Sequence, residues 1–339
     1  MVILIKSFNR AFYLDRCLSS IFKFAEGNFI IKIVDDGTPE KYLQKIKDKH
    51  PTVEIILSDN YQIKSQLISD QKEVDGFTIP VKEWKKAVNS SDKYTLIIED
   101  DVWFTDPINF HEIIQTMDAE SIDLVKLGWQ GAEKYNFNYT QTKLNQKVIA
   151  QYPNKKLFLA NAKTMNMVLE NKFKLKSILC RLNLFNNYTP LEYYELFSIL
   201  MGLYNKDYWN YLWKDIDVRV SERKQMVNAI EWRSKNIKKR SSICRTDKEY
   251  LKTTYSSTAT NSYRKYKTKV DINKINRILN DLWLNDKLDS ENNMPKDFDL
   301  KYLTDLVNVN YPNEINMELW HQWIGEFKED CLSYGAVVD

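Results

Sequence analysis

The sequence predicts an α/β protein in which a mostly parallel sheet is flanked by helices. Two observations lead to this prediction. Short apolar runs alternate with amphipathic segments through the first 130 residues, and polar clusters follow several of the apolar runs. The chain has 339 residues, of which 43% are hydrophobic and 13% aromatic, so a substantial core is expected. We therefore expect one large or two modest folded domains.

Four apolar runs in this part of the chain are interpreted as strands, because they are short and rich in β-branched residues. They lie at residues 2–5, 29–34, 53–57 and 94–98. Apolar residues recur at helical spacing between them, which predicts helices at about 14–25, 39–49 and 80–88. Strands that alternate with helices are typical of a parallel sheet with its faces covered.

The elements beyond residue 105 are less regular. Asp106 and Pro107 are expected to form the N-cap and first residue of a helix. Strands are predicted at 122–127 and 157–160. Helices are predicted at 164–170, from Thr189 through Leu203, at 221–232 and at 271–288. Residues 245–269 are basic, rich in hydroxyl groups and without a clear period, so we expect a mobile loop.

Composition excludes several classes of protein. The formal net charge is +3, too small to indicate a nucleic-acid binder, and the sequence contains no glycine-rich phosphate-binding motif. The four cysteines are scattered, as in reduced thiols of a cytosolic protein. The chain enters an apolar strand without a signal peptide, and no apolar run is long enough to cross a membrane. We expect a cytoplasmic protein.

Three consecutive acids, Glu99, Asp100 and Asp101, end the strand at 94–98. Carboxylates at the end of a buried strand are costly unless they are paired, and a divalent cation such as Mg²⁺ or Mn²⁺ is the usual partner. Alternation along a strand would point Glu99 and Asp101 to one side and Asp100 to the other. The alternative is a solvated strand end followed by a turn.

Two other polar clusters follow predicted strands, one at residues 7–10 and one at Asp35 and Asp36. Ligands of parallel α/β sheets bind beyond the carboxyl ends of the strands, so the three clusters together predict a site at one edge. Turn formation and helix capping before Pro39 are the alternative for Asp35 and Asp36.

These three blocks carry a resemblance. VILIKSFNRAFYLDRCLSSIF, IIKIVDDGT and LIIEDDVWF resemble the opening, the second strand and the metal-binding D-x-D region of family 2-type glycosyltransferases of the GT-A fold, the last in an E-D-D form seen in bacterial branches. Their spacing, about 30 and then 65 residues, also fits. The resemblance covers residues 2 to about 130 well, thins by 200 and is absent beyond about 240.

The resemblance implies a GT-A (Rossmann-like) fold and a metal-dependent transfer of sugar from a nucleotide-diphosphate sugar. UDP is the favoured nucleotide, and the acceptor would be a glycan, a lipid-linked sugar or a protein, with inversion expected. The implied metal ligands are Asp101 and Glu99, with Mn²⁺ or Mg²⁺ as cofactor. The implied contacts to the donor nucleotide are Ser7, Asn9, Arg10, Asp35, Asp36 and Asp100. Arg10 would support the diphosphate or pair with an aspartate.

The base that takes the acceptor proton is less well defined. The resembled family places the aspartate of a Glu-Asp pair at the start of a helix, but Tyr193 stands at that position here. Glu192 is therefore the expected base and Glu195 its reserve, whereas capping is the structural alternative for Glu192. Trp129 is expected to stack on an acceptor sugar or to be a core residue. Basic residues near 264–267 would close over the diphosphate, or simply form a solvated loop.

The expected organisation is a GT-A domain at 1–240, a flexible basic loop at 241–270 and a helical C-terminal extension at 271–339. Within the domain, 1–130 would bind the nucleotide sugar and 131–240 the acceptor. Peripheral contact with the inner face of a membrane is compatible with the basic, aromatic C-terminal third. The alternatives are a nucleotidyltransferase, disfavoured by the missing phosphate loop, and a catalytically degenerate GT-A-like protein that binds nucleotide or glycan.

Overall fold

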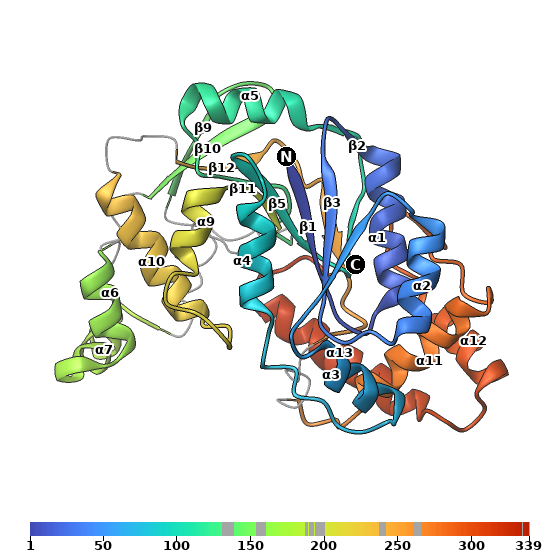
Figure 1. Cartoon of the computed structure of the whole chain (residues 1–339). Helices are drawn as coiled ribbons and strands as arrows, with labels where there is room; N and C mark the ends of the chain where they lie inside the picture. Colours follow the sequence, from blue (N-terminus) through green and yellow to red (C-terminus); the bar gives the residue numbers. More distant parts are fainter. Residues whose placement is uncertain are drawn as a thin grey trace.

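The computed structural model describes residues 1–130, 139–153, 161–186, 189, 193, 201–236, 242–259, 266–333 and 335–338. A nine-stranded sheet runs through the molecule, with helices on both of its faces (Figure 1). The α/β class with a mostly parallel sheet is therefore confirmed.

The large sheet contains β4 (Glu54–Leu57), β3 (Ile30–Asp35), β1 (Val2–Ser7), β5 (Tyr94–Glu99), β11 (Gly202–Asn205), β8 (Leu124–Lys126), β12 (Ile243–Thr246), β10 (Val148–Pro153) and β9 (Tyr139–Lys143), in that spatial order. The helices around it are α1 (Ala11–Phe24), α2 (Glu40–Lys49), α3 (Tyr61–Ser69), α4 (Val81–Asn89), α5 (Phe110–Glu120), α6 (Ala162–Leu169), α7 (Leu175–Arg181), α9 (Lys206–Leu212), α10 (Glu222–Lys235), α11 (Ile272–Leu284), α12 (Leu300–Asn310) and α13 (Met317–Ser333). Two small sheets pair β13 (Leu251–Thr253) with β6 (Val102–Phe104), and β2 (Ala25–Glu26) with β7 (Ile108–Asn109).

Strand direction is uniform where the candidate site lies. Strands β4, β3, β1 and β5 are all mutually parallel. Only β11 and β10 run against the others, so seven of the nine strands share one direction. The carboxyl ends of β1, β3 and β5 therefore meet at one edge of the sheet, as the polar clusters predicted.

Alternation along β1 explains why the first apolar run is continuous. Ile3 and Ile5 belong to a core that α1, α5 and α11 help to build, whereas Val2 and Leu4 belong to a second core with α4, α9 and α10. A strand buried on both faces has no position left for a polar side chain until its end. The first polar residues of the chain are consequently found at the sheet edge.

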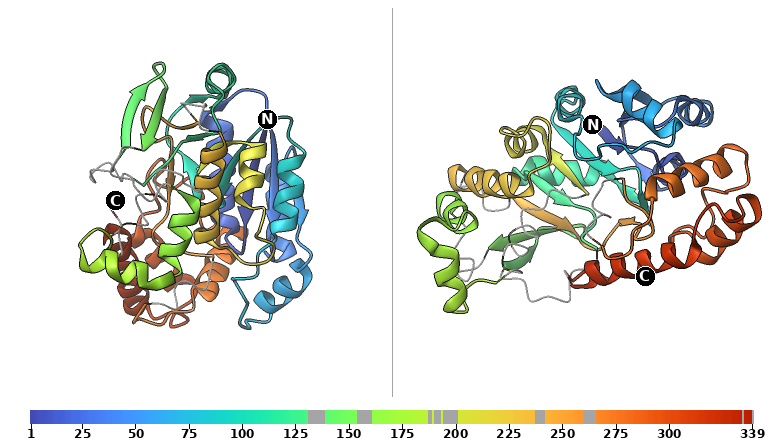
Figure 2. Two further views of the ribbon diagram at one scale, coloured as in Figure 1. Left: turned by 90° about the vertical axis from the view of Figure 1, so that its left-hand side faces the viewer. Right: turned by 90° about the horizontal axis from the view of Figure 1, so that it is seen from below.

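The C-terminal helices share the first core rather than forming one of their own. That core includes residues from Ile3 to Ile324. The buried carboxylate of Asp15 on α1 accepts hydrogen bonds from Trp283 Nε1 (2.8 Å) and Ser290 Oγ (2.6 Å). The predicted C-terminal helices are present, and α11 packs directly against α1, the helix that follows β1. Figure 2 shows them along one side of the molecule.

Three local predictions are wrong, and one helix is missing from the predicted elements. The loop expected at 245–269 contains the second half of β12 and all of β13, because β12 pairs with β8 and β10, and β13 pairs with β6. Leu203 lies in β11 rather than in a helix. Asn109, and not Asp106, caps the next helix: its side chain accepts from His111 N, while Asp106 pairs with Lys248. Helix α3 was not predicted. The expected strand at 157–160 lies outside the described residues.

Among the described residues, no helix combines the length and apolar character needed to cross a bilayer. All four cysteines are free, and Cys180 is the exposed one.

Candidate active site

The three polar clusters lie side by side at the edge of the sheet. Ser7 is in register with Asp35, and Lys6 is in register with Glu99. The carboxyl ends of β1, β3 and β5 therefore lie next to one another at the edge of the sheet. Residues that end or follow these three strands contact one another, for example Ser7 with Asp35 and Phe8 with Asp100.

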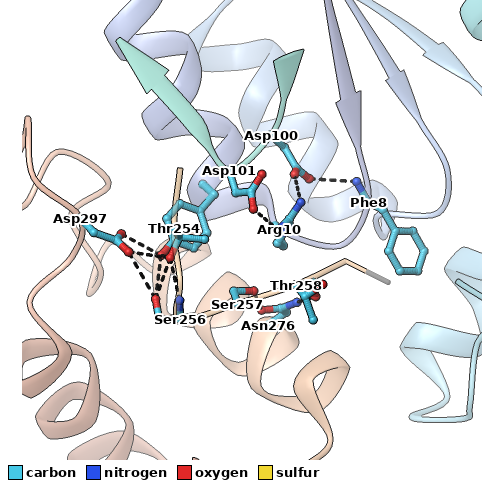
Figure 3. Close-up of polar contacts among 11 residues, drawn as sticks. Phe8, Arg10, Asp100, Asp101, Thr254, Ser256, Ser257, Thr258, Asn276 and Asp297 are labelled. Carbon is cyan, nitrogen blue, oxygen red and sulfur yellow. Dashed lines mark hydrogen bonds and ion pairs between the residues drawn. The ribbon is translucent and has the colours of Figure 1, made fainter. Parts of the chain in front are cut away.

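Arg10, which immediately precedes α1, lies between two members of the acid triplet. Its Nη1 donates to Asp101 Oδ2 (2.5 Å) and its Nη2 to Asp100 Oδ1. Asp100 Oδ2 also accepts from the backbone N–H of Phe8 (2.9 Å). All three charged side chains are buried, so the two carboxylates carry one more charge than the single guanidinium can neutralise (Figure 3).

The expected alternation of the acids is wrong. Glu99 is exposed, whereas Asp100 and Asp101 are both buried against Arg10. The reason is that β5 ends at Glu99 and residues 100 and 101 form a turn, where the alternation of a strand no longer applies. Glu99 therefore lies apart from the Arg10 contact.

Burial raises the pKa of both Asp100 and Asp101, and the nearby Arg10 opposes this shift. Asp101 Oδ1 is buried and has no hydrogen-bond partner among the described residues. An unpartnered buried carboxylate oxygen is a position that a hard cation would satisfy, and Mg²⁺ is commonly held by one or two carboxylates together with substrate phosphates. No group of three or more potential metal-binding side chains occurs in the described part of the chain. The residues fit a cation held by Asp101 and completed by a ligand.

Asp35 has a structural role at the end of β3. Its two oxygens accept from Ser7 Oγ (2.8 Å), Thr38 Oγ1 (2.6 Å), Thr38 N (2.7 Å) and Gly37 N (3.0 Å). Burial raises its pKa to about 6 in spite of these donors. The carboxylate ties the ends of β1 and β3 together, as the turn interpretation proposed. It is fully buried, so a direct contact with a nucleotide is not what this geometry offers.

Asp36 is paired with a lysine that sequence reasoning missed. Asp36 accepts from Ser58 Oγ (2.6 Å) and from Lys64 Nζ, which also donates to the carbonyl of Thr78 (2.6 Å). Gly37 allows this approach, because its φ is +141° and a Cβ there would lie 2.5 Å from Lys64 Cβ. Lys64 comes from α3, which has too weak a period to be predicted.

Asn9 links the edge to the C-terminal helices. It is buried with a φ of 52°, a conformation that asparagine tolerates better than most residues. The Nδ2 of Asn280 on α11 donates to the carbonyl (3.1 Å) and Oδ1 (3.2 Å) of Asn9. Asn9 thus fixes the loop before α1, and its side-chain contacts are internal.

Trp129 is not available to stack on a sugar. Its ring is 5% exposed, and the guanidinium carbon of Arg245 lies 4.5 Å from the ring centroid. Its backbone N–H donates to Glu249 Oε1 (2.5 Å). The alternative of a core tryptophan is the one that the structure supports.

The predicted bases, Glu192 and Glu195, lie outside the described residues, as do Arg264 and Lys265. Tyr193 is described and is buried. Lys267 is exposed, and its backbone N–H donates to Glu326 Oε2 (2.9 Å) on α13.

A second polar group lies next to the acids, built from Tyr13, Thr254, Ser256 and Asp297, and is called here the hydroxyl network. Tyr13 OH donates to Asp297 Oδ1 (2.9 Å) and lies 2.7 Å from Thr254 Oγ1. Thr254 Oγ1 donates to Asp297 Oδ2 (2.5 Å). Tyr13 follows Arg10 by three residues, so the network and the acids lie about one helical turn apart. Figure 3 shows Asp297, Thr254 and Ser256 beside Asp101.

Sequence patterns provide only a weak signal for the hydroxyl network. Its hydroxyl groups at Thr254 and Ser256 fall within the hydroxyl-rich stretch 245–269, for which the sequence predicts a loop. Pairing of β13 with β6 places Thr253 opposite Val102, directly after the acids. Asp297 comes from a segment with no distinctive pattern, and only the packing of residues 290–298 against α1 brings it here.

A cavity of about 640 Å³ opens beside this network. Trp103, Leu251, Phe298 and Ile324 supply apolar walls, and Asp297 and Asn293 supply polar groups. Burial raises the pKa of Asp297. A cavity with aromatic walls and a few polar groups is typical of small-molecule sites.

No protein-family model matches the chain, and no curated protein does. Three solved structures show how its fold compares. Residues 1–349 of TarS from S. aureus are 11% identical over 96% of this chain and 79% of that one, with a TM-score of 0.39. The same part of TarS in complex with UDP-GlcNAc is 12% identical over 96% of this chain and 80% of that one, with a TM-score of 0.39. The third structure is the mannosyltransferase PcManGT from Pyrobaculum calidifontis in complex with GDP-Man and Mn²⁺. It is 7% identical over 99% of this chain and 76% of that one, with a TM-score of 0.38.

Proposed function

We propose that the protein is a metal-dependent glycosyltransferase of the GT-A type that uses a nucleotide-diphosphate sugar. The observation that carries this proposal is the buried Arg10, which contacts both Asp100 and Asp101 beside the unpartnered Asp101 Oδ1. A buried cation and a free carboxylate oxygen at a strand-end edge suit a ligand that brings phosphates and a divalent ion.

Several residues of the chain would bind the metal ion, the diphosphate and the nucleoside. Asp101 would hold Mn²⁺ or Mg²⁺ through Oδ1, and that ion would act as a Lewis acid on the diphosphate. Arg10, already fixed by Asp100, would stabilise the charge that develops on the departing nucleotide. Asp36 and Lys64 form the wall on the β3 side, where the nucleoside would lie. Asp35 and Asn9 position the two loops, and Ser7 holds Asp35. Glu192 remains the proposed base, with Glu195 in reserve.

The nucleotide is tested by thermal shift with UDP, GDP, CDP and dTDP, each with and without Mn²⁺. We expect one nucleotide, UDP by preference, to raise the melting temperature only when the metal is present, since ligands that bind the native state stabilise it by mass action. A panel with no shift under any condition would contradict a donor site here. Binding without donor hydrolysis or transfer would favour the catalytically degenerate alternative.

We further propose that the cavity beside the hydroxyl network binds a carbohydrate acceptor. Its apolar and aromatic walls suit the faces of a sugar ring, and Asp297 can accept hydrogen bonds from hydroxyl groups. Because Tyr13 and Arg10 lie one helical turn apart, an acceptor held at Asp297 would lie next to the donor phosphates.

The acceptor site is tested with Asp297→Asn. We expect saturation-transfer NMR signals from a panel of neutral mono- and disaccharides to weaken on the order of tenfold or more, because the carboxylate acceptor of charge-assisted hydrogen bonds is lost. Nucleotide binding should be retained. Asp305→Asn on the exposed side of α12 is the matched control. Equal signals from both variants would exclude the cavity as the sugar site while leaving the donor proposal intact.

A further inference from the structure

The segment from Asn171 to Leu184, called here the basic tip, protrudes from the body of the protein. It contains a short 3-10 helix, Lys172–Lys174, followed by helix α7. In Figure 1 α7 lies at the end of the molecule opposite α12, and the right-hand view of Figure 2 shows the same separation. The tip is therefore distant from the C-terminal helices.

Large apolar side chains on the tip are exposed to solvent. Phe173 is 87% exposed, Leu182 60%, Leu184 53% and Ile178 47%. Phe173 has a φ of 53°, which is rare for a bulky residue, and the neighbouring residues 171 and 174 also have positive φ. The turn thus presents a phenylalanine outward at a conformational cost.

The tip is also strongly basic. Residues 171–189 contain Lys172, Lys174, Lys176 and Arg181 and no aspartate or glutamate. Lys172 pairs with Glu170 (2.8 Å), which Arg223 also contacts. Lys174 and Arg181 form no ion pair with a described residue. Their charges are directed to solvent around the exposed apolar groups.

The tip is anchored as a folded element. Leu175 and Leu179, one turn apart on α7, pack against the second core, and Phe185 after the tip is buried in it. The inner face of α7 is thus occupied, while the four outer apolar side chains remain between 47% and 87% exposed. A rigid support with an outward apolar and basic surface differs from a flexible loop that merely happens to be exposed.

We propose that the basic tip docks the protein on the surface of a bilayer that contains anionic lipid. Exposed apolar side chains ringed by lysine and arginine are typical of proteins that lie in the membrane interface. The cations complement the negative headgroups, and the four apolar side chains reach the boundary with the acyl chains. This inference does not depend on the proposed activity.

The test is co-sedimentation of the full chain with vesicles of phosphatidylcholine alone and of phosphatidylcholine with phosphatidylglycerol at 3:1. We expect binding to the anionic vesicles only, weakening as salt is raised. Lys174→Glu with Arg181→Glu, and separately Phe173→Ser with Leu182→Ser, should each lower the partition coefficient on the order of tenfold or more. All four positions are exposed, so the fold should be kept, as melting temperature can check.

The matched control is Lys287→Glu with Lys301→Glu, which makes the same charge change on the C-terminal side of the molecule. We expect its binding to stay within about twofold of the unmodified chain. An equal loss in the control, or no binding to either vesicle, would overturn the proposal. Overturning would also follow if the tip variants changed the oligomeric state in size-exclusion chromatography without affecting vesicle binding, because a second copy of the chain would then be the occupant.

A second readout uses Cys180, the exposed cysteine within the tip, labelled with an environment-sensitive fluorophore in a Cys331→Ser background. Anionic vesicles should shift its emission to the blue as the label leaves water. A label that stays in a water-like environment while the protein co-sediments would place the contact elsewhere and contradict the tip as the docking surface.

Discussion

Asp101→Asn is expected to lower kcat/KM for sugar transfer on the order of 10³-fold, because it removes a carboxylate oxygen beside Arg10 that has no partner within the described part of the chain. The fold should survive. Burial already raises the pKa of Asp101, so the neutral amide is well tolerated, and Arg10 keeps its contact with Asp100. Kinetics with the donor identified by thermal shift provide the measurement.

A readout other than activity separates loss of the metal site from loss of the fold. The Mn²⁺-dependent part of the nucleotide thermal shift should vanish in Asp101→Asn, while the melting temperature of the free protein changes little. Asp106→Asn, which alters a solvent-facing carboxylate five residues away, should keep both properties. Transfer within a few-fold of the unmodified enzyme would exclude Asp101 as a metal ligand.

Arg10→Met is expected to destabilise the protein by about 3–5 kcal/mol, because it leaves two buried carboxylates without their cation. The loss should depend on pH. Without Arg10, the folded-state pKa values of Asp100 and Asp101 rise further above their unfolded values. Stability from such groups is fully present below the unfolded pKa and is lost as pH rises through the folded pKa. The variant should therefore be weakest near pH 8 and recover toward pH 5.

Urea unfolding at pH 5 and pH 8 measures this effect. Adding Asp100→Asn and Asp101→Asn to Arg10→Met should restore part of the stability at pH 8, since the unpaired charges are then gone. Arg277→Met, which removes a looser ion pair with Asp281 (3.7 Å), should show little pH dependence. A loss that is the same at both pH values would mean that the Arg10 side chain stabilises the fold through packing alone.

Sequence patterns were most informative where local chemistry decides structure. The apolar runs that became β1, β3, β4 and β5 could be found because strands buried on both faces exclude polar residues. The polar residues directly after them were therefore recognisable as a cluster at a sheet edge. Helices with a strong apolar stripe, such as α1 and α11, could be predicted because their apolar residues recur at helical spacing.

Patterns failed where contacts between distant segments decide structure. Strand β12 has only a short apolar run and is a strand because β8 and β10 pair with it. The acids do not alternate, because the chain turns at Asp100. Lys64 pairs with Asp36 across 28 residues, and no spacing rule predicts such a contact.

Local patterns along the chain are sufficient to predict the fold class, the positions of the first strands and the residues at their ends. Periodicity and burial act on neighbouring residues, so they can be read along the chain. Contacts between distant segments establish which of those residues are left at the proposed ligand site and which make internal contacts. In the folded chain Asp35, Asn9 and Trp129 make internal contacts, whereas Tyr13, Thr254 and Asp297 come together to form the hydroxyl network. Such choices depend on packing between segments up to 284 residues apart, which no local pattern records.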